Sequence, residues 1–202
     1  MKYRTINTLL ILNLLALTAL LLRPFDITPL TSAQTPSAPA TRDNPELARM
    51  MDEDQADRTP DDPKSIDWKI VGPRDAARLK RVKELYAQNQ LKTGRDYYHA
   101  AMILQHGDVA DDFLLAHELC VAAISKGEER AKWLAAASED RFLMNIGRPQ
   151  RFATQFRCDG LPNCKYQLYK TDEGVTDELR SVLNVPSLAE AKAREAKMQS
   201  NK

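Results

Sequence analysis

The chain has almost no net charge, few histidines and few cysteines, and each scarcity excludes a class of function. It holds 29 basic and 28 acidic side chains, so no overall electrostatic field favours a nucleic acid as partner. One of its three histidines lies in a His-Glu-Leu-Cys segment at 117–120, which lacks the second histidine of a zinc-protease motif. No other catalytic or metal motif of known mechanism occurs, so we expect no metal ion and no cofactor.

Residues 1–22 have the features of an export signal. A basic start precedes an apolar run from Ile6 to Leu22, which covers roughly 25 Å as a helix and is slightly short for a bilayer core. No cysteine lies near the run, which excludes a lipoprotein. Residues 23–43 are rich in Pro, Ser, Thr and Ala, as is typical of a flexible tether. We expect a protein of the periplasm or cell envelope. It is secreted if the leader is cleaved near Ala33; otherwise the leader anchors it and is its only contact with the membrane.

Three cysteines fit an oxidising compartment. Cys158 and Cys164 flank a turn-rich loop between two strand-like segments, so we expect a disulfide that closes a hairpin. A zinc site is the alternative, but only two thiolates are present there and no histidine follows. Cys120 lies within an apolar helical segment and is expected to be an inert core thiol.

Residues 44–200 predict one mainly α-helical domain, a helical bundle or a helical-hairpin domain with a small β-hairpin after its central helices. Short connections make neighbouring helices antiparallel. Segments 151–158 and 164–170 are strand-like, and the predicted disulfide closes the hairpin between them. Trp68 and Ile70, before the second helix, are expected to pack on the core. The expected helices start at Asn44-Pro45 and Gly72-Pro73, then cover about 94–106, 109–126 (capped by Asp108), 128–146 and 175–184, before a terminal helix with a Ser187–Glu190 capping box.

Acidic and basic residues are unevenly spread along this domain. Residues 41–67 hold nine acidic against four basic side chains, whereas residues 69–95 hold eight basic against two acidic ones. Adjacent blocks of opposite sign most simply attract each other within the fold. A basic patch for an acidic partner is the alternative.

Polar side chains interrupt apolar helix faces at several positions between 54 and 155. Charge on an apolar face costs several kcal/mol unless it is paired, so such residues either hold the fold together or serve a site. Asp54 extends an apolar stripe and has Arg58 four residues on, the spacing of a helical ion pair. Glutamines suit places where the chain leaves a helix, because a side-chain amide donates and accepts at once. The full set is Asp54, Arg58, Gln105, His106, Asp140, Arg141, Gln150, Thr154 and Gln155.

Asp140 is the leading candidate for a functional group. Apolar residues share its helix face, so its carboxylate should be removed from water and should need a cation close by. The candidate cations are Arg58, Arg141, Arg148 and His106. An aspartate that orients a histidine recurs in acid–base sites, which makes His106 with Asp140 the catalytic hypothesis. No serine or cysteine nucleophile accompanies the pair in a known motif, so a structural network and a ligand or peptide site are the competing interpretations.

The other two histidines have simpler explanations. His99 lies seven residues before His106 on the same helix face, so the two could share a metal, but no carboxylate repeats the pattern. His117 falls on an apolar stripe and is expected to be a hydrogen-bonded core residue.

Several of these segments, in this order, resemble an uncharacterised bacterial family of small, often exported, helical proteins. The family shows a DQ-x-x-R, QH, DR and G-x-P-Q-x-x-G-T-Q pattern and has no established activity, so the resemblance groups the residues without implying a mechanism. Ala153 stands where the pattern has glycine; if that position needs positive φ, alanine costs about 1 kcal/mol there. The matching segments are Asp54-Gln55-x-x-Arg58, Gln105-His106-Gly107, Ala116-His117-Glu118-Leu119, Asp140-Arg141 and Gly147-Arg-Pro-Gln150-x-x-x-Thr154-Gln155.

The sequence thus favours a non-enzymatic helical module of the cell envelope, whose polar set holds the fold together or binds an unknown small ligand or protein partner. The alternative is a hydrolase or transferase that uses a His106–Asp140 acid–base pair.

Overall fold

The computed structural model describes residues 41–59, 65–158 and 165–200. The predicted leader, most of the tether and Cys164 lie outside the described residues. The described ranges contain α2 (Pro45–Arg58), α3 (Trp68–Ala87), α4 (Gly94–Leu104), α5 (Ala110–Ser125), α6 (Ala131–Asn145), β1 (Phe156–Cys158), β2 (Tyr166–Leu168), α7 (Asp177–Val182) and α8 (Leu188–Ser200). The prediction of a mainly helical domain with a small hairpin is confirmed.

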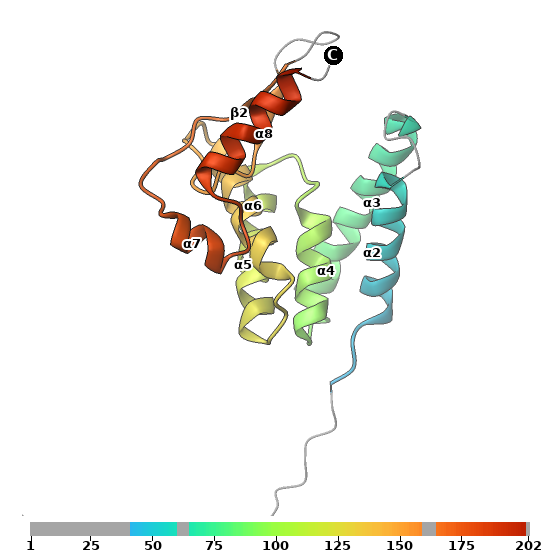
Figure 1. The fold of residues 1–202 in the computed structure, drawn as a ribbon. Coiled ribbons are helices and arrows are strands. Elements are labelled where there is room, and N and C mark those ends of the chain that lie inside the picture. The colour runs from blue at the N-terminus through green and yellow to red at the C-terminus, as the bar shows by residue number, and fades with distance from the viewer. Residues whose placement is uncertain (1–40, 60–64, 159–164, 201–202) are drawn as a thin grey trace, which may run out of the picture. The chain divides into compact units, whose positions relative to one another are not determined.

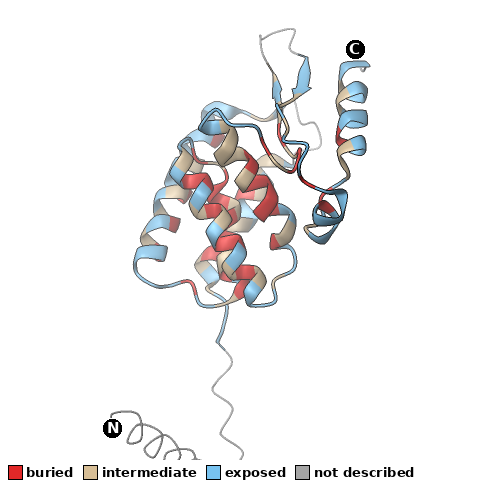
Figure 2. Cartoon of the chain, turned by 90° about the vertical axis from the view of Figure 1, so that its left-hand side faces the viewer, coloured by how far each residue is buried: buried red, intermediate tan, exposed pale blue. Residues whose placement is uncertain are grey.

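Helix α4 lies at the centre of a five-helix bundle. It packs against α5 on one side and against α2 and α3 on the other, and α5 packs against α6 (Figure 1). Buried residues gather where these helices face one another (Figure 2). A second, smaller core of Ala136, Phe152, Val175 and Val185 joins α6 to the segments that follow it. This smaller core supports the part of the molecule in which Asp140, Gln150, Thr154 and Gln155 lie.

Helix α3 begins earlier than the sequence predicts. The Asp67 carboxylate accepts a hydrogen bond from the Lys69 amide at 3.0 Å, so the helix starts at Trp68 and runs through Pro73. Two side chains of its first turn face solvent: Trp68 is 61% exposed and Ile70 is 51% exposed, whereas Val71 is buried. The expectation that these two side chains pack on the core is therefore wrong.

Other helix ends agree more closely with the sequence. The Asn44 side chain caps α2, and Ser187 with Glu190 forms the capping box of the terminal helix. The N-cap position of α5 is Val109, which makes no side-chain cap, so the predicted cap at Asp108 is wrong. None of the helices in the described ranges is long and apolar enough to cross a membrane.

The hairpin is shorter than predicted. Its two three-residue strands pair antiparallel, with Phe156 opposite Leu168. A separate, parallel bridge joins Gln150, before β1, to Thr171, after β2. Because Cys164 is outside the described residues, the Cys158–Cys164 disulfide stays a prediction.

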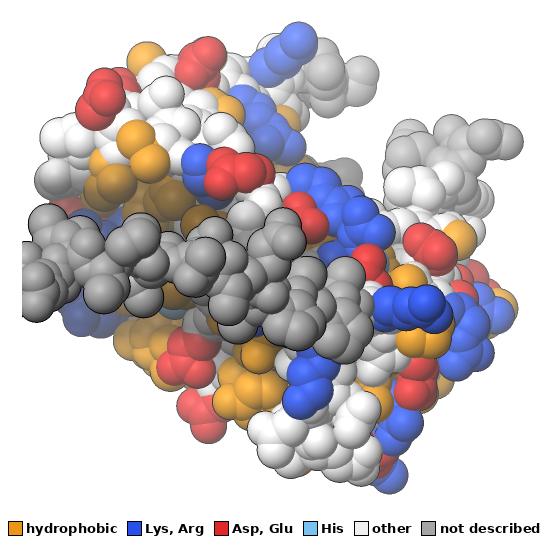
Figure 3. All heavy atoms as spheres, turned by 90° about the horizontal axis from the view of Figure 1, so that it is seen from below, with side chains coloured by type: hydrophobic (Ala, Val, Ile, Leu, Met, Phe, Trp, Pro, Cys, Tyr) orange, Lys and Arg blue, Asp and Glu red, His pale blue; other side chains and the backbone are white. Residues whose placement is uncertain are grey.

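The two charge blocks pair with each other across α2 and α3, as predicted. Arg74 and Arg78 of α3 bond the two carboxylate oxygens of Asp57 in α2, at 2.6 and 2.8 Å. Nearer the other end of the helices, Arg81 bonds Glu46 at 2.7 Å. Acidic and basic side chains also lie next to each other on the face drawn in Figure 3. Much of the positive charge of residues 69–95 is thus neutralised within the fold.

Candidate functional site

Asp140 in α6 is fully buried, and its carboxylate accepts four hydrogen bonds from the loop that follows the helix. Oδ1 accepts from the backbone amides of Arg151 and Phe152, at 2.7 and 2.9 Å. Oδ2 accepts from the amide and the hydroxyl of Thr154, at 3.0 and 2.7 Å. One side chain therefore holds residues 151–154 against the end of α6.

The donors to Asp140 are not the cations that the sequence suggests. In the part of the chain that the structure describes, no hydrogen bond or ion pair joins Asp140 to Arg58, Arg141, Arg148 or His106. The chain turns back at Gly147, where φ is +76°, and brings its own amides over the carboxylate. Backbone amides can satisfy a buried carboxylate without any cation, which explains the difference.

Two glutamines complete the support of this loop. The buried Gln150 side chain donates to the carbonyl oxygens of Gln155 and Tyr169, at 3.0 and 2.9 Å, and accepts from the Gln155 amide at 2.8 Å. Gln155 donates in turn to the Ala137 carbonyl oxygen at 3.3 Å. Gln150 and Gln155 thus satisfy backbone groups after α6, as expected of glutamines, whereas the Gln105 side chain at the end of α4 donates to Met102 Sδ instead. We call Asp140, Gln150, Thr154 and Gln155 the Asp140 group.

The backbone of this loop is strained at one position. Ala153 has φ of +61°, in the left-handed region where glycine is favoured, and it is 4% exposed. Its neighbours Phe152 and Thr154 both donate to Asp140, so hydrogen bonds on either side fix the unusual conformation. The glycine of the resembling family pattern corresponds to this position, which does require positive φ.

Of the remaining predicted residues, Arg58 and His106 lie beside Asp54. The buried Asp54 carboxylate bonds Arg58 at 2.9 Å and Gln55 at 2.9 Å. His106 Nε2 lies 3.4 Å from Asp54 Oδ2 and makes no hydrogen bond to any described residue. We call Asp54, Arg58 and His106 the Asp54 group. Gln105 and Arg141 meet at the end of α4: the Gln105 side chain donates to Met102 Sδ, and Arg141 donates to the Gln105 carbonyl oxygen. The set expected as one cluster is therefore divided, and His106 faces Asp54 rather than Asp140.

Helix α3 supplies charged residues that sequence reasoning missed. Arg58 bonds Asp75 at 2.6 Å, and Arg78 bonds Asp75 at 2.7 Å. Arg78 Nε also lies 3.8 Å from Asp54. Two features of the sequence could have indicated these contacts: the i, i+3 spacing of Asp75 and Arg78, and the opposite charge of residues 41–67 and 69–95.

Hydrogen bonding and burial shift the pKa of several of these groups. Burial by itself raises the pKa of Asp57 and of Asp75, but hydrogen bonds from arginines outweigh it and both pKa values are lowered. Burial lowers the pKa of the Arg141 guanidinium, and the like charge of Arg58 lowers it further. Arg141 makes one long hydrogen bond, 3.4 Å to the Gln105 carbonyl oxygen, and no ion pair with a described residue.

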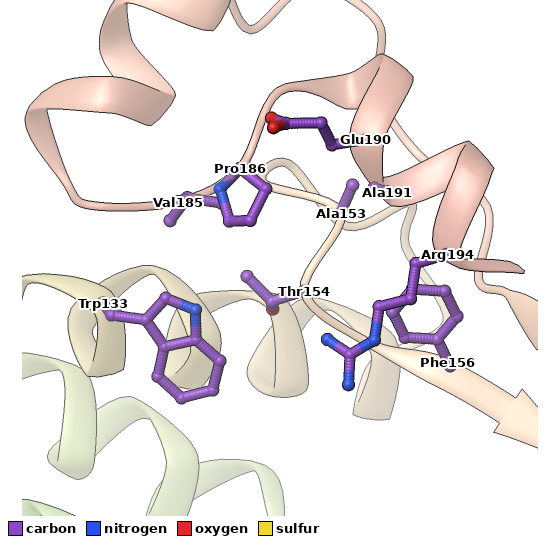
Figure 4. Close-up of a pocket in the computed structure, with 9 residues that line it drawn as sticks. All are labelled: Trp133, Ala153, Thr154, Phe156, Val185, Pro186, Glu190, Ala191 and Arg194. Atoms are coloured by element: carbon purple, nitrogen blue, oxygen red, sulfur yellow. The ribbon is translucent and has the colours of Figure 1, made fainter.

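A small pocket lies beside the Asp140 group. It has a volume of about 180 Å³ and opens between α6, the loop after it, the segment before α8, and α8 itself (Figure 4). Thr154 contributes to its wall, so the carboxylate of Asp140 holds part of the pocket in place. We call it the Trp133 pocket, and it is lined by Trp133, Ala153, Thr154, Phe156, Val185, Pro186, Glu190, Ala191 and Arg194.

The other residues singled out from the sequence have structural surroundings. His117 Nδ1 lies 2.9 Å from the Ala135 carbonyl oxygen, so the expected hydrogen bond is present, but the residue is only partly buried and does not belong to the core. Cys120 is free and fully buried, and burial raises the pKa of its thiol to about 12, as expected for an inert core thiol. Burial lowers the pKa of His99. Among the described residues, no group of histidine, cysteine, aspartate and glutamate side chains could hold a metal ion.

The chain matches no known family profile, no curated protein and no solved structure.

Proposed function

We propose that the protein is a non-enzymatic binding module of the bacterial cell envelope and that the Trp133 pocket is its ligand site. The observation that carries the proposal is a concave, largely apolar pocket whose wall is held by a buried carboxylate. Sites for small ligands are typically concave and apolar, with a few polar groups at fixed positions. The Trp133 pocket has this composition, because Thr154, Glu190 and Arg194 are the polar members of its lining.

Preorganisation favours binding at this place. Four hydrogen bonds to Asp140 already order residues 151–154. A ligand therefore does not have to order this loop when it binds, which removes one cost of association. Trp133 is 40% exposed at the edge of the pocket, although indole rings are among the groups that gain most from burial.

Export and a hairpin disulfide form part of the proposal. The basic start and apolar run of residues 1–22 support export, and an oxidising compartment would allow Cys158 and Cys164 to join. Closing so short a loop contributes about 2 kcal/mol in the chain-entropy model. Intact mass before and after reduction and alkylation checks the bond; alkylation of both cysteines without prior reduction would count against it.

The fluorescence of Trp133 gives a direct test of the pocket. Trp68→Phe leaves Trp133 as the one tryptophan, because the chain has two. Benzyl alcohol, phenylacetate and phenethylamine serve as ring probes of different charge. We expect at least one of them to change Trp133 emission in a saturable way. If none does at millimolar concentration, the pocket is not a site for ligands of this size and the proposed function falls.

A matched pair of variants locates the binding. Ala191 is 6% exposed and lines the pocket, so Ala191→Leu should fill it and abolish the response. Ala193 is exposed on the same helix, and Ala193→Leu should leave the response unchanged. A response that survives Ala191→Leu would place the probes elsewhere.

One observation favours a second candidate, acid–base catalysis by a hydrolase or transferase. His106 Nε2 lies 3.4 Å from the buried Asp54 carboxylate, an arrangement in which an aspartate can orient a catalytic histidine. Hydrolysis of p-nitrophenyl acetate is a suitable probe. If this candidate is right, the protein hydrolyses the probe, folded His106→Gln protein does not, and folded His117→Gln protein still does. Hydrolysis that is unchanged in His106→Gln would reject the candidate.

A further inference from the structure

We infer that the Trp133 pocket selects small carboxylic acids with an apolar body, and that Arg194 binds their carboxylate. The inference rests on the proposed function and adds a ligand class to it. It follows from three features of the lining: an arginine without an acidic partner in the described ranges, a glutamate held in a helix cap, and an apolar wall of limited size.

Arg194 is a cation with no carboxylate partner among the described residues. It projects from α8, and its guanidinium carbon lies 5.2 Å from the centre of the Phe156 ring, a cation–π contact. It makes no ion pair with any residue in the ranges 41–59, 65–158 and 165–200. In Figure 4 the guanidinium reaches from α8 toward Thr154 and Trp133. Its donors are thus available beside the apolar wall.

Helical spacing would normally give Arg194 a partner on its own helix. Glu190 precedes it by four residues, the order that favours a glutamate–arginine pair. The Glu190 carboxylate instead accepts hydrogen bonds from the amide and the hydroxyl of Ser187, both at 2.7 Å. These bonds lower the pKa of Glu190, so it stays charged and remains in the capping box. The cap therefore leaves Arg194 without the partner that its spacing predicts.

The opposite charges of Glu190 and Arg194 also make the two sides of the pocket different. In Figure 4 the Glu190 carboxylate lies beside Pro186, whereas the Arg194 guanidinium lies on the side of Phe156. A ligand carboxylate is attracted to the Arg194 side and repelled from the Glu190 side. A cationic ligand would need the reverse orientation, toward a carboxylate whose Oε2 already accepts two hydrogen bonds from Ser187.

The wall sets the size and character of the rest of the ligand. Trp133, Val185 and Pro186 present apolar surface, and the indole can stack against a ring. The volume of about 180 Å³ is below the range of roughly 300–1,000 Å³ that is usual for drug-sized ligands. A ring or short branched chain with one acidic group fits this space better than a long fatty acid.

Most arginines that line other hollows of the described surface are already neutralised. Arg74 and Arg78 lie in a hollow between α2 and α3, and both bond Asp57. Arg151 lies in a hollow near Pro149 and pairs with Asp172 at 3.3 Å. Arg148 makes no ion pair with a described residue, but the hollow that it lines also holds the carboxylates of Glu139 and Asp172. Arg194 differs from them in lining a largely apolar pocket without such a partner, which is why the inference concerns this pocket.

The test measures affinities by Trp133 fluorescence in the Trp68→Phe background. We expect phenylacetate to bind about threefold more tightly than benzyl alcohol and phenethylamine, because Arg194 is exposed and water screens a charge pair at the surface. Arg194→Gln should remove the preference, so that phenylacetate and benzyl alcohol bind alike. Lys192→Gln is the matched control: Lys192 is exposed on the same helix and pairs with Glu173, so the preference should persist.

Comparing phenylacetate with benzyl alcohol within each variant distinguishes the loss of a charge from damage to the pocket, because damage lowers the affinity for both probes. Equal affinity for phenylacetate and benzyl alcohol in the parent protein would overturn the inference and leave the pocket as a binding site. Tighter binding of phenethylamine would overturn it as well, in favour of a site for cations at Glu190. Absence of binding by every probe would reject the inference together with the proposed function.

Discussion

At the scale of single residues, Ala153 shows how the loop beside the pocket is kept in an unfavourable conformation. An alanine in the left-handed region costs about 1–2 kcal/mol, because its Cβ crowds the following carbonyl oxygen. The hydrogen bonds from Phe152 and Thr154 to Asp140 offset this cost. The sequence indicated the position only through the glycine of a resembling pattern; φ itself could not be inferred from an alanine.

Ala153→Gly should therefore stabilise the protein. Relief of the positive φ outweighs the extra freedom of glycine in the unfolded chain, so we expect a gain of about 1 kcal/mol and a melting midpoint higher by roughly 2–4 °C. Thermal unfolding followed by circular dichroism measures the change. Ala76→Gly, at an exposed position of α3, is the control and should lower stability by about 1 kcal/mol. A lower midpoint for Ala153→Gly would mean that the loop does not bear this strain.

At the scale of secondary-structure elements, the helices could be predicted and their polar contacts could not. Capping residues and glycines gave most helix ends within a few residues, since caps act locally. The start of α3 was missed because Asp67 caps the helix ahead of Pro73. The partners of Asp140 were missed for a different reason: they are mainly backbone amides, which every residue but proline has and which leave no mark in a sequence.

Asp140→Asn tests how strongly α6 holds the following loop. An asparagine places an amide donor against groups that are themselves donors, so at least one buried bond is lost and its donor is left unsatisfied. We expect a loss of about 3 kcal/mol and a midpoint lower by roughly 6–12 °C. Asp108→Asn, at an exposed position before α5, should change the midpoint little. An unchanged midpoint for Asp140→Asn would show that the loop does not depend on these bonds.

At the scale of the whole molecule, the ion pairs between α2 and α3 make the free energy of unfolding depend on pH in the acidic range. Hydrogen bonds from arginines lower the pKa of Asp57 and Asp75 below the ordinary value of 3.8. A carboxyl whose pKa is lower in the folded state contributes stability above its unfolded pKa, and that contribution is lost as pH falls through the folded pKa. Glu139 acts in the opposite sense, because burial raises its pKa and its stabilising protonated form is lost as pH rises.

We therefore expect the melting midpoint to fall as the pH drops below about 4. The fall should be shallower in Asp75→Asn, although that variant is less stable at neutral pH because Arg58 and Arg78 lose a partner. Asp52→Asn is the control, since Asp52 is exposed on α2 and should leave the slope as it is. Parallel pH profiles for the parent protein and Asp75→Asn would show that the paired carboxylates are not the source of the acid dependence.

The consecutive residues Asp140 and Arg141 have one more consequence, for how α6 can be oriented. Asp140 bonds the loop at 151–154, while Arg141 donates to the Gln105 carbonyl oxygen at the end of α4. Successive residues of a helix point about 100° apart, so the two side chains meet different neighbours only at one rotation of α6 about its axis. This adjacent pair fixes the rotation of α6 about its axis. Trp133 lies seven residues before Asp140 and therefore on nearly the same face of the helix. The pair thus also fixes the direction in which the Trp133 indole faces the pocket.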